Sequence, residues 1–80
     1  MSIPTRRRRQ QIIDEYGFSS AFMDIAVAGL RKYPDRYRNA VIRSGKTTMI
    51  DLEMFWDWLK YRDALEVNTT VPLFRREEYQ

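Results

Sequence analysis

The stretch from Arg38 to Leu52 constrains the fold of this chain most. Two runs rich in aliphatic and β-branched residues lie on either side of Ser44-Gly45. A glycine at this point accepts the positive φ that two-residue hairpin turns need. One face of such a ribbon can pack on other elements while the other stays in water. The pattern predicts a β-hairpin with strands at Ala40–Ile42 and Thr47–Ile50 and a turn at Ser44-Gly45.

Helical patterns precede and follow this hairpin. Apolar residues spaced by three and four predict helices over Arg6–Tyr16, from about Ala21 to Lys32 or Tyr33, and from Leu52 to about Leu65. Gly17 and Pro34 are suited to end the first two helices. Ser19 or Ser20 is a suitable N-cap for the second helix, and Asp51 for the third. So few residues separate the first two helices that they must cross.

This order of elements predicts a small α+β winged helix-turn-helix, with three helices and a two-stranded β-hairpin wing between helices 2 and 3. A length of 80 residues allows one domain. We assign residues 1–66 to the domain and residues 67–80 to a C-terminal arm. Pro72 argues against a continuous helix through the arm. A mobile or partner-dependent arm is favoured over one that folds back on the core.

The third predicted helix is rich in aromatic residues. Phe55, Trp56 and Leu59 follow helical spacing, so we expect them in the core. Trp58 widens the apolar arc, and we expect it to lie partly exposed at the edge of the core.

The composition excludes many kinds of active site. The chain has no cysteine and no histidine, which removes disulfides, thiolate metal sites and the commonest general base. Glu53 and Asp57 are four residues apart, where we expect a solvated acidic face rather than a metal site. The triplet Gly45-Lys46-Thr47 lacks the upstream glycine of a phosphate-binding P-loop. We therefore expect a protein that is not an enzyme, with no cofactor and no metal.

The hydropathy pattern bears on the compartment. No apolar run approaches the roughly 20 residues that a membrane span requires. The N-terminal arginines are not followed by the apolar segment of a secretory signal. We expect a soluble cytoplasmic protein that has no membrane partner.

Charge is unevenly distributed along the chain. The net charge is only +3, but residues 1–13 carry four arginines and no acid. Residues 31–50 carry six bases and one acid, and they include the predicted hairpin. Segregated positive charge is typical of a phosphate-binding surface. An ordinary solvated surface is the alternative, and composition alone weighs the two evenly.

Double-stranded DNA is the partner that this pattern favours. The candidate DNA-binding residues are Ser19, Ser20, Arg31, Lys32, Arg36, Arg38, Arg43, Lys46, Arg6, Arg7, Arg8 and Arg9. Arg43 and Lys46 flank the tip of the predicted wing, where they suit the DNA backbone and a narrow minor groove. The second helix offers few groups that read bases. Its Asp24 would be repelled by phosphate unless it accepts a hydrogen bond from a cytosine N4.

The order of elements resembles the small excisionases, or recombination directionality factors, of phages and conjugative transposons. These share a winged-helix fold related to the MerR DNA-binding domain. The resemblance covers roughly Arg8 to Arg62. It rests on Tyr16-Gly17-Phe18-Ser19-Ser20, Leu30-Arg31-Lys32, Val41-Ile42-Arg43-Ser44-Gly45-Lys46, and Thr48-Met49-Ile50-Asp51 followed by Phe55 and Leu59.

The resemblance implies an architectural role in a bacterial or phage-infected host cell. Such a factor binds repeated sites beside a recombination junction, bends the DNA and assists a tyrosine recombinase in excision. It also implies self-association on DNA and contact of the C-terminal segment with the integrase. Here the candidate partner-binding residues are Val71, Leu73, Phe74 and Tyr79.

Two other functions fit the same sequence. A small transcriptional regulator of a mobile element would have the same fold and the same DNA-binding surface. A protein-interaction or inhibitor module would instead use the apolar second helix, Trp58 and the tail.

Overall fold

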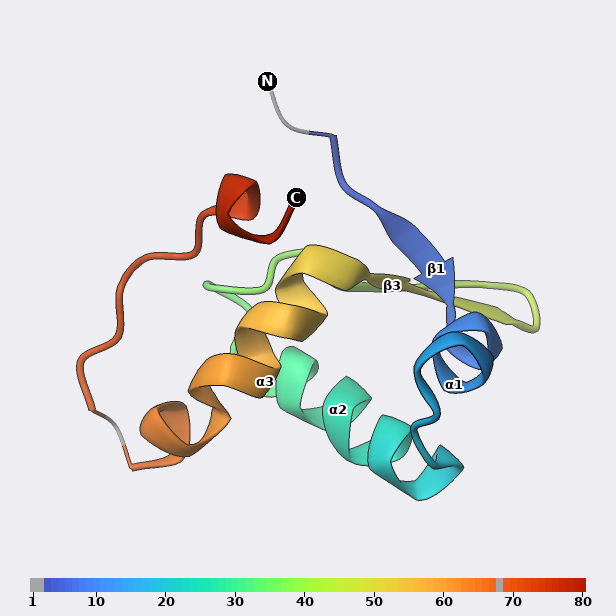
Figure 1. Cartoon of the computed structure of the whole chain (residues 1–80), viewed down its shortest axis with the longest axis horizontal. Helices are drawn as coiled ribbons and strands as arrows, with labels where there is room; N and C mark the ends of the chain where they lie inside the picture. The colour runs from blue at the N-terminus through green and yellow to red at the C-terminus, as the bar shows by residue number, and fades with distance from the viewer. Residues whose placement is uncertain (1–2, 68) are drawn as a thin grey trace.

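Three helices and a three-stranded antiparallel sheet form a small α+β fold (Figure 1). This computed structural model describes residues 3–67 and 69–80. The elements are β1 (Arg6–Arg8), α1 (Arg9–Tyr16), α2 (Ser20–Lys32), β2 (Val41–Ser44), β3 (Thr47–Asp51), α3 (Leu52–Glu66) and a short 3₁₀ helix, η1 (Arg76–Tyr79). The order of strands in the sheet is β1-β3-β2. Within the described ranges no helix has the length and apolar character needed to cross a membrane.

The tight connection between α1 and α2 follows from local sequence. Gly17 ends α1 with a φ of 74°, and its backbone N–H donates to the carbonyl of Ile13. Ser19 is the N-cap of α2, because its hydroxyl accepts from the backbone N–H of Phe22 at 3.0 Å. These two residues confirm the predicted break between the helices and place the start of α2 one residue before the expected Ala21.

The predicted start of the first helix at the N-terminal arginines is wrong. The first helix begins at Arg9 rather than Arg6, because residues 6–8 form β1. Arg6 pairs with Asp51 and Arg8 with Met49, so the predicted two-stranded hairpin is the larger part of a three-stranded sheet. The backbone N–H of Leu52 extends this pairing by donating to the carbonyl of Thr5 at 2.8 Å. Arg8 is the N-cap of α1 and Arg9 is its first residue, so two cations remain at this helix N-terminus, where they oppose the helix dipole.

The β2–β3 hairpin forms as expected, with its turn one residue later than predicted. Ser44 pairs with Thr47, so the two central residues are Gly45 and Lys46. Gly45 has a φ of 59°. A glycine with positive φ at the first central position is typical of the type II′ turn, whose twist matches that of the paired strands. This turn places Lys46 at the tip of the hairpin.

The core lies between the sheet and the helices. Its largest fully buried apolar side chains are those of Ile12, Met23, Leu30, Ile50 and Phe55. Trp58 is only 5% exposed whereas Trp56 is half-buried, so the expected roles of the two tryptophans are reversed. Trp58 packs against Gly29, where a Cβ atom would lie 2.3 Å from its Nε1. The absence of a side chain at Gly29 therefore allows α2 and α3 to approach closely.

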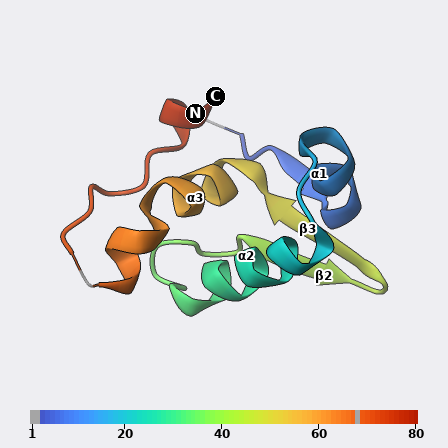
Figure 2. The same cartoon turned by 60° about the horizontal axis from the view of Figure 1, so that its bottom comes forward.

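The C-terminal segment, residues 69–80, folds back along α3 rather than extending from the domain (Figure 2). The rings of Phe74 and Tyr79 stack with centroids 6.1 Å apart. The Tyr79 hydroxyl donates to Oδ1 of Asp57 on α3 at 2.6 Å. This is the arrangement that the sequence left as the less favoured alternative.

Candidate nucleic-acid interface

A groove runs between α2 and the β2–β3 hairpin, and we call it the α2–hairpin groove. It is lined by Arg9, Asp24, Val27, Ala28, Arg31, Arg43 and Thr48. Because α2 crosses α1 after a tight turn, Arg9 at the start of α1 reaches the same groove as the middle of α2. Three of the seven lining residues are arginines, so the groove is strongly basic.

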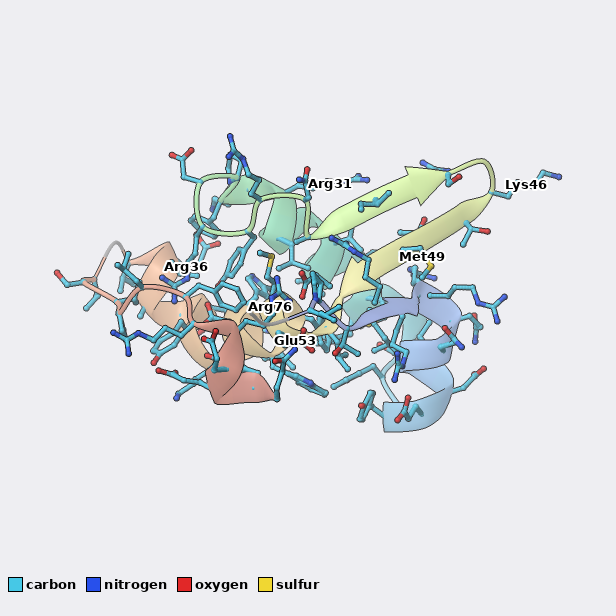
Figure 3. The ribbon with its side chains drawn as sticks, turned by 90° about the horizontal axis from the view of Figure 1, so that it is seen from above. Arg31, Arg36, Lys46, Met49, Glu53 and Arg76 are labelled. Carbon is cyan, nitrogen blue, oxygen red and sulfur yellow. The ribbon has the colours of Figure 1, made fainter. Side chains whose placement is uncertain are left out.

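Positive charge continues beyond both ends of this groove. Arg31 also lines a hollow with Arg38, beside the loop that joins α2 to β2. Arg9 lines a further hollow with Arg8 and Lys46, between α1 and the hairpin. Figure 3 shows Lys46 pointing outwards from the hairpin tip and Arg31 near the other end of the hairpin. The shared linings make one basic strip, consisting of Arg8, Arg9, Arg31, Arg38, Arg43 and Lys46.

Most cations of the basic strip are exposed and available to a ligand. Five of them have no ion pair with any described carboxylate: Arg8, Arg31, Arg38, Arg43 and Lys46. They therefore need break no internal salt bridge to bind a phosphate. Phosphate contacts of this kind supply most of the affinity of DNA-binding proteins.

Arg9 is the sixth cation of the basic strip, and it is engaged within the protein. Its Nη2 donates to Oδ1 of Asp24 at 2.8 Å and to the Oγ and carbonyl of Ser20 at 2.9 and 2.8 Å. The Asp24 side chain remains 75% exposed. Arg9 therefore neutralises the acid whose repulsion from phosphate counts against α2 as a DNA-binding helix. The sequence gives no sign of this pair, because the two residues meet only when the helices cross.

Arg36 lies outside the basic strip although the sequence suggests it as a backbone contact. Its Nε donates to Asp57 Oδ2 at 2.9 Å, and its Nη1 donates to the carbonyl of Pro72 at 2.6 Å. Its side chain is only 13% exposed. Burial is the largest influence on its pKa and lowers it, but the hydrogen bonds with Asp57 and Tyr37 and the negative charge of Asp57 together leave the pKa raised. A guanidinium engaged in this way is not available to DNA.

Lys32 also points away from the basic strip. Its Nζ pairs with the Glu66 carboxylate on α3 at 2.9 Å. The hydrogen bond that Lys32 donates to Glu66 raises the pKa of Lys32 and lowers the pKa of Glu66. Both side chains are exposed, so a phosphate can compete for this lysine only at the cost of the pair.

Four further candidate residues make internal hydrogen bonds. The Ser19 hydroxyl caps α2, and the Ser20 hydroxyl accepts from Arg9. Arg6 Nη1 donates to the carbonyl of Asn39 at 2.9 Å, and Arg7 Nη1 donates to the carbonyl of Arg6 at 3.1 Å. The Ser20 bond joins α2 to α1, and the Arg6 bond joins β1 to the loop before β2, whereas the Ser19 and Arg7 bonds are local.

A second charged cluster is buried at the start of α3, and it contradicts the expected solvated acidic face. Asp51, Glu53 and Asp57 are 1%, 2% and 1% exposed. Arg76 donates to both oxygens of Asp51 and to Glu53 Oε1, each at 2.8 Å. No metal-binding group of three or more ligands occurs among the described residues. The sequence does not reveal this cluster, because Arg76 lies more than twenty residues after its partners.

Asp57 accepts three further hydrogen bonds in this cluster. Tyr37 donates to its Oδ2 at 2.7 Å, Arg36 donates to the same oxygen, and Tyr79 donates to Oδ1. Burial, followed by the hydrogen bond to Asp57, raises the pKa of both tyrosines. These bonds satisfy a carboxylate that would otherwise be costly to bury.

The four candidate partner-binding residues differ in exposure. Leu73 is 85% exposed, whereas Val71, Phe74 and Tyr79 are half-buried. Phe74 packs against the core, and the Tyr79 hydroxyl is bonded to Asp57. Leu73 is therefore the most accessible of the four.

Comparison of the chain with protein-family models, with curated proteins and with solved structures finds no match.

Proposed function

We propose that this chain is a DNA-binding architectural factor of the excisionase type. In this proposal α1 and α2 form a helix-turn-helix and the β2–β3 hairpin is its wing. The observation that carries the proposal is the basic strip, which extends from the loop after α2, across the groove, to the hairpin tip. Five of its six cations are exposed and unpaired among the described residues.

The shape of the surface supports duplex DNA rather than a small anion. A helix such as α2 fits the major groove, and a hairpin beside it reaches the adjacent backbone or minor groove. Arg43 and Lys46 would then grip the wing side of the DNA, and Arg38 a phosphate beyond the C-terminal end of α2. Cations spread along a strip match a row of phosphates better than a single bound ion.

Binding to duplex DNA at several salt concentrations tests the proposal. We expect Arg43→Ala and Lys46→Ala each to weaken binding at physiological salt. Each variant should lower the slope of log affinity against log salt by about 0.9, because one phosphate contact and its counterion release are lost. Gel shifts or fluorescence anisotropy give both the affinity and its salt slope. The duplexes are DNA from the flanks of the mobile element that encodes the chain and an unrelated sequence.

Two surface variants away from the basic strip are matched controls. Arg75→Ala and Lys60→Ala remove exposed cations from the C-terminal segment and from α3. Both should retain wild-type affinity and salt slope. An unchanged slope in the two hairpin variants, or an equal loss in the two controls, would contradict the proposed interface.

The recombination role needs a separate measurement. An excisionase bends attachment-site DNA and raises excision by the integrase encoded beside it. We therefore expect the chain to bend attachment-site DNA, which resonance energy transfer between dyes at the two ends of a duplex measures. We also expect it to stimulate excision by a purified tyrosine recombinase. A footprint over a promoter with no effect on recombination would instead identify a transcriptional regulator that uses the same surface.

One observation favours a second candidate function. Ile25 is 56% exposed on α2, beside Ala21 and Ala28, so part of this helix has the apolar character of a protein contact. A protein-interaction module would show no duplex binding at low salt and a stable complex with a protein partner. Ile25→Ser would then weaken that complex without changing the fold.

A further inference from the structure

The α2 wall of the α2–hairpin groove has a simple chemical order. Asp24 lies at one end and Arg31 at the other, and the side chains of Val27 and Ala28 lie between them. Asp24 and Arg31 are seven residues apart, which is almost two full turns, so they share one face of the helix. Along this face of the helix, a carboxylate that accepts hydrogen bonds is followed by an apolar surface and then by a guanidinium that donates several hydrogen bonds.

The acceptor at the first end is held in place before any ligand binds. Arg9 binds Oδ1 of Asp24 at 2.8 Å and is itself fixed by two oxygens of Ser20. No described residue donates to Oδ2, and the side chain is 75% exposed. One carboxylate oxygen is therefore free to accept from a ligand, while Arg9 compensates the charge that phosphates would repel.

The donor at the second end is free. Arg31 is exposed and has no ion pair with a described carboxylate, although it lies on the same helix face. In the major groove of DNA, a carboxylate accepts from cytosine N4, an arginine donates to guanine O6 and N7, and a small apolar side chain contacts the thymine methyl. The side chains along α2 are therefore suited, in order, to contact a cytosine, a thymine and a guanine.

We propose that α2 reads DNA sequence directly, with Asp24 selecting a cytosine and Arg31 selecting a guanine. This inference rests on the proposed function, since it requires α2 to enter the major groove. Seven residues of helix span about 10.5 Å, which equals about three base-pair steps. The two selected pairs are thus about three steps apart, and Ala28 faces a thymine methyl between them. Arg9 is the positioning residue for Asp24.

Selection of binding sites from duplexes with a randomised segment tests this inference. The wild-type chain should enrich a C·G pair and a G·C pair at that spacing. Asp24→Asn should change the preference at the first pair alone from cytosine to adenine, because an asparagine pairs with adenine N6 and N7. The change should be about fivefold or more in relative affinity, which is the lower end of the discrimination that one well-placed side chain gives between bases. Arg31→Ala should remove the guanine preference at the second pair alone.

A third variant is the matched control. Asp63→Asn removes a carboxylate from α3 that is even more exposed than Asp24, and it should leave every base preference unchanged. Wild-type binding with no base preference, or the same preferences in Asp24→Asn and Arg31→Ala as in wild type, would overturn the inference and leave the proposed function standing. Absence of wild-type binding to any duplex at low salt would overturn both.

Discussion

Asp57 shows how a single residue organises this small protein. It is almost fully buried, yet its two oxygens accept from Arg36, Tyr37 and Tyr79. The three donors come from the loop after α2 and from the C-terminal segment, so the carboxylate joins both to α3. Removing one donor leaves a buried charge less well satisfied, which costs more than the bond itself contributes.

Tyr37→Phe tests this contribution. We expect the free energy of unfolding to fall by about 1.5–3 kcal/mol, because a hydrogen bond to a charged group is lost while the ring stays in place. Urea denaturation measures the change. Tyr61→Phe is the control, since its hydroxyl has no hydrogen bond with the described residues and its removal should change stability by less than about 0.5 kcal/mol. Equal effects of the two variants would disprove the role of Asp57.

Gly29 has a role of a different kind, as a point of close contact between helices. Gly29→Ala places a Cβ atom 2.3 Å from Trp58 Nε1, so α2 and α3 must move apart. We expect a net loss of about 1–3 kcal/mol despite the better helix propensity of alanine. Thermal unfolding followed by circular dichroism measures it. Ala21→Met adds more atoms at an exposed position of the same helix and should be nearly neutral.

At the scale of elements, the features that sequence predicts well are those determined locally. Gly17, Ser19 and Asp51 act through their nearest neighbours, and all three end or cap helices as expected. The β2–β3 hairpin is also local, since only two residues separate its strands. β1 is different, because its partner β3 lies some forty residues later and a run of arginines has no strand periodicity.

The C-terminal segment is the second element that local signals do not reveal. Its anchor is Arg76, which is 14% exposed and pairs with the buried Asp51 and Glu53. The two acids alone look like first-turn residues of a helix in water. Only the folded chain brings a cation from the tail beside them.

Arg76→Ala tests whether this anchor holds the segment. The variant leaves two buried carboxylates without their cation, so we expect a loss of about 3–5 kcal/mol and proteolytic cleavage within residues 69–80. Denaturation and limited proteolysis give the two measurements. Arg75→Ala removes the exposed neighbouring arginine, and it should neither lower the stability nor make residues 69–80 sensitive to proteolysis. A stable, protease-resistant Arg76→Ala protein would show that the segment is held by other contacts.

Over the whole molecule, two sets of positive charges have opposite roles that composition cannot separate. One set forms the basic strip, and the other, Arg36 and Arg76, neutralises buried carboxylates. Both sets look alike in the sequence, and only burial and pairing distinguish them. The candidate DNA-binding residues could therefore be named from sequence, but which of them remain available could not.

The stability of the whole fold should depend on alkaline pH. The pKa values of Tyr37 and Tyr79 are raised in the folded state by burial and by Asp57. Above about pH 10 the unfolded chain loses these protons while the folded protein keeps them. The contribution of the two tyrosines to the free energy of unfolding is therefore fully present below that pH, and it is lost as the pH rises further. Unfolding of wild type and of the double variant Tyr37→Phe/Tyr79→Phe between pH 8 and about 11 measures it, and a parallel decline in both would contradict the assignment.

The two ends of the described chain meet at one carboxylate. Glu53 Oε1 accepts from the backbone N–H of Thr5 and from Arg76, and Gln80 Nε2 donates to the carbonyl of Ile3 at 2.7 Å. Figure 2 shows the C-terminal segment on the opposite side of the molecule from the hairpin tip. A dye, a surface tether or a fused domain joined to either end of the described chain would therefore lie on the same side of the molecule. The hairpin tip, with its part of the basic strip, would remain accessible to solvent.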